Sequence, residues 1–184
     1  MDPAVIATLI LIFINVGIFA LPFVFDFGKG MYSSFQEFLM YGWKENQAIK
    51  EGEFYRLLTS IFLHADAIHL LSNMWALWIF GRGLNPVVML PIFFISGLAG
   101  NILSFFFNQN PSVGASGAIF GLVGFLLALS LRLNSLDVVS LDLTLFVIVS
   151  FVFAAIPGSR IDIFGHLGGL ITGFVIGMVG IGII

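Results

Sequence analysis

The chain of 184 residues contains no cysteine, and only 9% of its residues are charged. Without cysteine it cannot form disulfides, use a thiol as a nucleophile or bind metal through thiolates. Its basic residues number only 7, they form no run, and the formal net charge is -3. Nucleic acid is therefore not expected as a partner, because such partners need clustered positive charge.

Hydrophobic residues are what the chain has in excess. They make up 59% of the sequence, with 22 Phe and a mean hydropathy of +1.10, whereas soluble domains average about 45–50% apolar residues. The lipid bilayer is therefore the expected environment, and the composition predicts an integral membrane protein.

Six apolar segments follow one another, each near the roughly 20 residues that a helix needs to cross a bilayer. They are expected at Ala4–Phe25, Leu57–Phe80, Val87–Phe107, Ala115–Leu131, Val138–Ala155 and Ile163–Ile184. Because backbone groups in lipid must be hydrogen-bonded internally, each segment is predicted to be helical. The expected fold is an all-α membrane protein, a six-transmembrane-helix bundle forming a single domain over residues 1–184.

The long connection Asp26–Arg56 separates the first two segments. Phe35, Phe38 and Leu39 recur in it at helical spacing, which predicts a short amphipathic helix in the membrane interface. The polar run Lys44–Glu53 is then expected to return to water.

Polar residues converge on one face of this bundle. If the six helices alternate in direction, the second, fourth and sixth all begin on the same face, and Ser116 and His166 lie close to two of these starts. His69 and Asn73 are expected further into the second segment. Because polar groups in a bilayer are costly and usually functional, this pattern predicts a water-accessible cavity.

Two rows of small residues refine this geometry. The rows are Gly117, Gly121, Gly124 and Ala128 in the fourth segment, and Gly165, Gly169, Gly173 and Gly177 in the sixth. Such rows let transmembrane helices approach closely. Ser116 lies one residue before its row and His166 one residue after the start of its own, each displaced by about 100° around its helix. The spacing therefore aims both side chains into one cleft.

Acyl transfer is the chemistry that fits these residues. A serine hydroxyl needs an adjacent base, for which His166 is the candidate. The Ser116 backbone N–H, His69 and Asn73 could stabilise an oxyanion. No carboxylate has an obvious claim to orient His166, so a dyad is expected, with Phe120 stacking on the imidazole. A metal site involving His64 is not expected, because no His-Glu-x-x-His helix is present.

Four motifs together resemble the rhomboid intramembrane serine proteases of the minimal six-span type. They are Arg56–His64, His69–Met74, Gly114–Gly117 and Gly165–Gly169. The resemblance implies a catalytic dyad of Ser116 and His166, an oxyanion site lined by His69 and Asn73, and supporting roles for Gly114, Gly117, Phe120 and His64. It also implies cleavage of transmembrane protein substrates near the outer face of the cell membrane, without cofactor.

The chain departs from the common family pattern in three places. Tyr55-Arg56 replaces a Trp-Arg pair, Phe120 stands where a tyrosine is frequent, and the segment Gly81–Asn85 lacks a glutamate found in many members. None of these positions supplies the nucleophile.

The sequence leaves alternatives open for the membrane orientation and for the function. Loop Lys and Arg residues favour a cytoplasmic site by the positive-inside rule, whereas the resemblance places the site outside. One alternative function is an inactive rhomboid-like protein that binds membrane clients. Another is a small proton-coupled transporter that relays protons through His166, His69 and Asp142.

Overall fold

The structure, a computed structural model, describes residues 1–24, 31–134, 141–154, 156 and 161–180. Within these ranges the chain is helical apart from its connections and an isolated β-bridge between Lys44 and Ser112. The elements are α1 (Pro3–Val24), α2 (Met31–Gly42), α3 (Asn46–Lys50), α4 (Arg56–Thr59), the 3-10 turn η1 (Ser60–Phe62), α5 (Ala67–Gly81), α6 (Pro86–Phe107), α7 (Ser116–Leu133), α8 (Leu141–Ala154) and α9 (Ile163–Val179).

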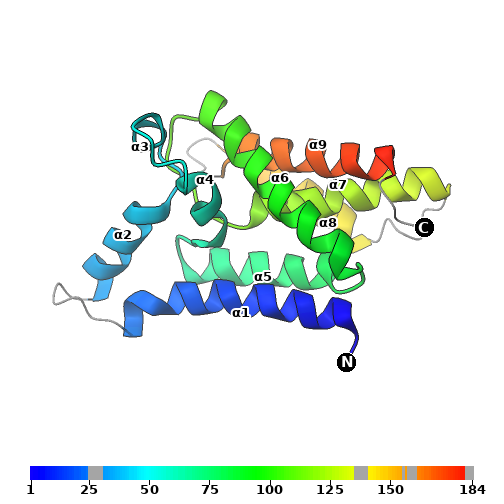
Figure 1. Cartoon of the computed structure of the whole chain (residues 1–184), viewed down its shortest axis with the longest axis horizontal. Coiled ribbons are helices and arrows are strands. Elements are labelled where there is room, and N and C mark those ends of the chain that lie inside the picture. The colour runs from blue at the N-terminus through cyan, green and yellow to red at the C-terminus, as the bar shows by residue number, and fades with distance from the viewer. Residues whose placement is uncertain (25–30, 135–140, 155, 157–160, 181–184) are drawn as a thin grey trace.

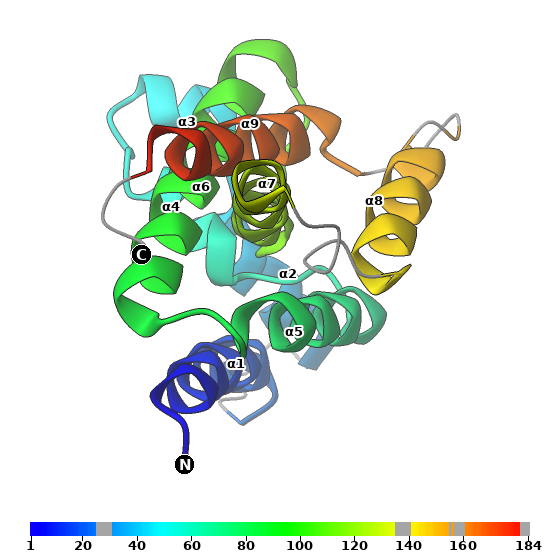
Figure 2. The same ribbon diagram turned by 90° about the vertical axis from the view of Figure 1, so that its right-hand side faces the viewer.

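Helix α7 lies at the centre of the bundle. Figure 2 shows it end-on, with α5, α6, α8 and α9 around it. Every residue from Ala118 to Phe125 is buried, as expected for a helix that is apolar on all sides. Any group at the start of α7 is therefore held by an element whose central turns are fully packed.

The closest packing in the bundle is between α7 and α9. A Cβ on Gly169 would overlap the carbonyl oxygen of Gly117, and one on Gly173 would overlap that of Gly121. The two glycine rows thus face each other, which confirms what their four-residue spacing predicted. Because no side chain separates the two backbones, the helices approach to carbonyl contact.

Three helices are long and apolar enough to cross a membrane, judged by length and composition over the described residues. They are Pro3–Val24, Pro86–Phe107 and Ser116–Leu133. Helices α5 and α9 are apolar but shorter, with 15 and 17 residues. At about 1.5 Å per residue, α5 rises about 22 Å, less than the roughly 30 Å of a bilayer core. The ends predicted at 138–140, 155 and 181–184 lie outside the described residues.

The prediction of one continuous helix over Leu57–Phe80 is wrong. The chain forms α4 and η1, passes through an irregular segment at 63–66, and begins α5 only at Ala67. The side chain of Asp66 accepts a hydrogen bond from the backbone N–H of His69 at 2.8 Å and so caps the new helix. His69 consequently lies in the first turn of α5, not deep inside a span.

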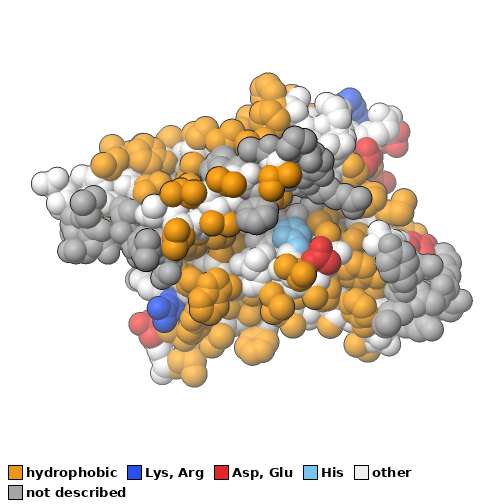
Figure 3. Space-filling model, turned by 180° about the vertical axis from the view of Figure 1, so that it is seen from behind, with side chains coloured by type: hydrophobic (Ala, Val, Ile, Leu, Met, Phe, Trp, Pro, Cys, Tyr) orange, Lys and Arg blue, Asp and Glu red, His pale blue; other side chains and the backbone are white. Residues whose placement is uncertain are grey.

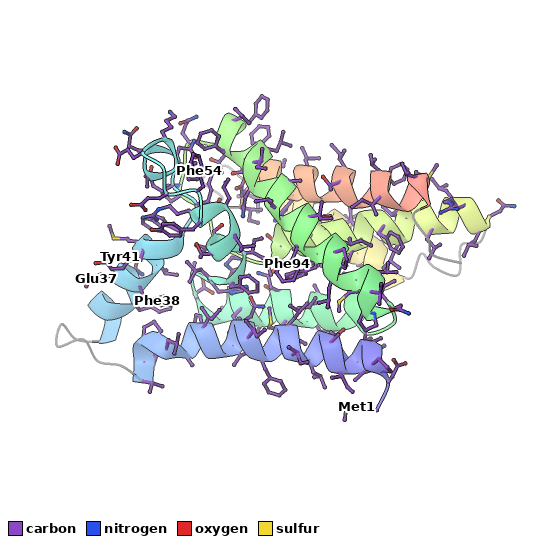
Figure 4. The ribbon with its side chains drawn as sticks, viewed as in Figure 1. Met1, Glu37, Phe38, Tyr41, Phe54 and Phe94 are labelled. Atoms are coloured by element: carbon purple, nitrogen blue, oxygen red, sulfur yellow. The ribbon has the colours of Figure 1, made fainter. Side chains whose placement is uncertain are left out.

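The first connection gathers α2, α3 and α4 at one end of the molecule (Figure 1). The predicted amphipathic helix is present as α2, whose Phe35 and Leu39 are buried against Leu63. Glu37 and Tyr41 lie on its outer side, away from the bundle (Figure 4). The expectation that Lys44–Glu53 returns to water is wrong for its first part, because Lys44 is 0% exposed and Asn46 is 5% exposed.

The glycine packing predicts that an added methyl group destabilises the protein at the α7–α9 contact but not at an open position. Gly169→Ala should lower the free energy of unfolding by about 1–3 kcal/mol, the usual cost of overpacking, because its Cβ meets the Gly117 carbonyl. Gly17→Ala is the matched control, since nothing lies within 4 Å of a Cβ there. Thermal unfolding in mild detergent measures both, and equal stability of the two variants would contradict this packing.

Candidate active site

Ser116 and His166 meet at the α7–α9 contact. His166 Nε2 lies 2.9 Å from Ser116 Oγ, within hydrogen-bond distance. Ser116 is half-buried at the first position of α7, and His166 is 6% exposed in the first turn of α9. The two residues that the sequence singled out as nucleophile and base are thus brought together, although they are 50 positions apart in the chain.

The glycine rows explain why these side chains meet. Ser116 precedes Gly117 and His166 follows Gly165, and a Cβ on Gly117 would lie 3.1 Å from the Gly165 carbonyl oxygen. Both side chains therefore project from the end of the helix contact at which α7 and α9 begin. Phe120, one turn further along α7, stacks on the imidazole with ring centroids 4.4 Å apart and an interplanar angle of 24°. The imidazole plane is held by this ring.

The start of α9 is fixed by Asp162. Its side chain accepts a hydrogen bond from the Gly165 N–H at 3.0 Å, which caps the helix. The hydroxyl of Ser104, on α6, donates to the other carboxylate oxygen. Neither Asp162 nor Ser104 was among the site residues that the sequence predicted. An aspartate just before an apolar run is the capping signal that could have identified the first.

His69 and Asn73 lie beside the segment that leads into Ser116. A Cβ on Gly114 would be 2.7 Å from His69 Nε2 and 3.4 Å from Asn73 Nδ2. Asn73 is buried, and its Nδ2 has no hydrogen-bond partner among the described residues. A buried donor without a partner is costly, so this amide is available to an incoming oxygen. Both predicted oxyanion residues are therefore next to the loop that carries the nucleophile.

One face of the molecule shows a histidine beside an acidic side chain within an apolar surface (Figure 3). His64 and His166 are buried, whereas His69 is half-buried. The rings of His64 and His69 pack edge to face with centroids 5.1 Å apart. His64 thus contacts the ring of His69 and not the serine. Over the described residues, no group of three or more His, Asp or Glu could hold a metal ion.

The backbone conformation of the loop is equally specific. Gly114 has φ of +124°, a conformation that favours glycine. Ala115 then precedes α7 without a side-chain cap, so the first N–H groups of the helix, including that of Ser116, lack helical partners. These donors carry the positive end of the helix dipole. The arrangement can stabilise a developing negative charge.

Fold and site together define an all-helical integral membrane protein with a serine–histidine pair inside its helix bundle. Comparison with known proteins agrees with this class. Residues 51–182 match the family model described as the rhomboid domain.

Curated relatives carry related names. The chain is 43% identical over 140 residues to "Rhomboid protease GluP" of Bacillus subtilis, covering 73% of this chain and 27% of that protein. It is 38% identical over 149 residues to "RHOMBOID-like protein 4" of Arabidopsis thaliana, covering 76% and 37%. It is 32% identical over 151 residues to "Rhomboid-like protease 2" of Toxoplasma gondii, covering 78% and 53%.

The chain belongs to the rhomboid family. This membership confirms the resemblance carried by the four motifs. The chain spans between 27% and 53% of the length of these three relatives, so the match covers only part of each of them.

The contacts of Gly114 predict how a substitution there changes the reactivity of Ser116. Gly114→Ala should lower the rate at which a fluorophosphonate probe phosphonylates Ser116, with loss of fluoride, at least about tenfold, because the new Cβ displaces His69 and the serine loop. Gly52→Ala is the matched control: its φ is also positive, at +106°, but nothing lies within 4 Å of its Cβ. Similar losses in both variants would show that backbone strain alone, and not the contact with His69, matters.

Proposed function

We propose that this chain is an intramembrane serine endopeptidase that cleaves transmembrane protein substrates through a Ser116–His166 dyad. The single observation that carries the proposal is the 2.9 Å contact between Ser116 Oγ and His166 Nε2 within a membrane helix bundle. A serine hydroxyl becomes nucleophilic when an adjacent base takes its proton. The names of two relatives, both called proteases, support the same activity.

The proposed reaction follows the usual course of acyl transfer. Ser116 Oγ attacks the scissile carbonyl carbon while His166 Nε2 accepts the hydroxyl proton. The Ser116 N–H, Asn73 Nδ2 and His69 Nε2 hold the oxyanion of the tetrahedral intermediate. His166 then returns the proton to the leaving amine, and a water molecule, deprotonated by His166, hydrolyses the acyl-enzyme. The reaction requires no cofactor and no metal ion.

The proposed architecture has six transmembrane helices, an interfacial first loop and a water-accessible cavity. The starts of α5, α7 and α9 support it, because each carries a polar residue: Asp66, Ser116 and Asp162. Since hydrolysis needs water and a bilayer core has none, these helix starts are the natural water entry. We place this face outside the cell membrane, following the family resemblance.

Cleavage by purified protein tests this proposal. In proteoliposomes containing a single-span substrate, the wild-type chain should release cleaved product, and Ser116→Ala and His166→Ala should lower the rate by at least about 10³-fold. Ser130→Ala, which alters a buried serine at the other end of α7, should retain activity. A folded wild type that binds the substrate without cutting it would favour the client-binding alternative. Proton flux independent of Ser116 would favour the transporter.

Substrate helix stability should control the rate. A transmembrane helix keeps its carbonyls hydrogen-bonded in lipid, so the substrate must unwind locally before a peptide bond can reach Ser116. Substrates with Gly, Ala or Ser at the cleavage point and a helix-weakening residue beyond it should be cut fastest. The measurement is kcat/KM over a series of substrates that differ only in helix propensity. A rate that ignores this propensity would contradict the expectation.

A further inference from the structure

Lys44 is the most unusual buried side chain of the first loop. It is 0% exposed, although lysine is almost never fully buried without a partner. Its Nζ donates to the carbonyl oxygens of Asn108 at 2.7 Å and Asn110 at 3.2 Å. Its backbone also pairs with Ser112 in both directions, at 2.9 and 3.0 Å. Every one of these partners lies in the linker 108–115, which joins α6 to Ser116.

Neighbouring residues extend this attachment along the linker. The side-chain amide of Asn46 donates to the carbonyl oxygens of Phe105 at 3.0 Å and Asn108 at 3.2 Å. At the other end, the Gly114 N–H donates to the Ser60 carbonyl oxygen at 2.9 Å. The linker is thus held from its beginning to its last residues by the segment that precedes α5. The position of Ser116 depends on this attachment as well as on α7.

Lys44 also interacts electrostatically with the residue that caps the helix carrying His166. Burial lowers the pKa of Lys44, whereas the negative charges of Asp162 and Glu45 act in the opposite direction. Asp162 caps α9, and its carbonyl oxygen accepts the His166 N–H at 3.1 Å. The ammonium group is therefore bonded to the linker that carries Ser116 and attracted to the residue that fixes the start of the His166 helix.

Global stability alone is a poor explanation of this arrangement. A buried charge loses its hydration, and its contacts often return less energy than a well-packed apolar residue would. What such a charge does supply is a defined geometry, because its partners must surround it in one arrangement. The two carbonyl partners of Lys44 Nζ lie in the linker that carries Ser116. The carboxylate whose charge acts on Lys44, that of Asp162, caps the helix that carries His166.

We propose that Lys44 is a positioning residue for the serine–histidine pair. It holds the linker 108–115 so that Ser116 Oγ stays within hydrogen-bond distance of His166 Nε2. This inference rests on the proposed function. Lys44 touches neither reacting atom, so it acts on the geometry of the site and not on the chemistry directly. Losing it should slow the chemical step while leaving the binding of a transmembrane substrate largely unchanged.

The experiment compares Lys44→Met, which keeps an unbranched side chain shorter by one atom but removes the donor, with two controls. Lys50→Met changes an exposed lysine of α3. Arg132→Met removes a 3.1 Å bond to the Gly177 carbonyl at the far end of α7 and α9. We expect Lys44→Met to lower kcat about 10- to 100-fold with KM within about twofold, since small misplacements have effects of this size. Both controls should stay within about twofold of wild type in kcat.

Hydrogen exchange gives a second readout that needs no activity. In Lys44→Met, the amides of the linker should exchange faster than in Arg132→Met at matched thermal stability. Lys44→Gln, which retains a neutral donor, should recover part of both kcat and protection. If Lys44→Met folds poorly, Lys44→Gln alone carries the comparison with Arg132→Met.

The outcomes separate the two claims. Normal kcat or unchanged linker exchange in Lys44→Met, with an active wild type, overturns the positioning role and leaves the proposed function standing. An inactive but folded wild type overturns the proposed function and this inference with it, whereas the exchange data then still show whether Lys44 holds the linker. A loss of kcat shared equally by Arg132→Met would reduce Lys44 to a general stabilising residue and would also overturn the inference.

Discussion

The structure depends on the approach of α7 and α9 to backbone contact. Gly117 and Gly121 face Gly169 and Gly173 with no side chain between them, so the two helices share a single seam. Side chains that project from this seam at the N-terminal ends of α7 and α9 are close enough to contact each other. Ser116 and His166 occupy those positions, and their 2.9 Å contact follows from the seam. Phe120 then fills the space beside the imidazole. The geometry of the serine–histidine pair therefore depends first on helix packing and second on loops.

Sequence reasoning predicted this part well because its signals are local and periodic. Glycines four residues apart identify the packing face of a transmembrane helix, and one-residue displacements from Gly117 and Gly165 give the direction of the neighbouring side chains. The stack of Phe120 on His166 follows from the same helical spacing. Apolar length likewise predicted α1, α6 and α7 to within a few residues. These features need only the pitch of a helix and a parallel pair of helices.

The remaining features depend on contacts between distant segments. Hydropathy joined residues 57–80 into one span, because averaging over a window hides the polar His64 and Asp66. It also cannot detect a helix that restarts at an Asp66 cap. A lysine among polar neighbours also looks solvated, and nothing nearby in the chain indicates that Lys44 is bonded to carbonyls 64 and 66 positions away. The bond from Ser104 to Asp162 joins α6 to α9 and is equally invisible to local patterns. Sequence thus predicted that Ser116 and His166 meet, but not the loop and capping contacts that hold them.

The central claim is that His166 makes the Ser116 hydroxyl reactive inside the bundle. The most direct measurement is treatment of the detergent-solubilised protein with a fluorophosphonate, followed by peptide mass mapping of the adduct. The account predicts a single covalent adduct on Ser116 in the wild-type chain and none in His166→Ala when both proteins are equally folded. An unmodified wild type, an adduct on another serine, or equal modification of Ser116 without His166 would contradict it.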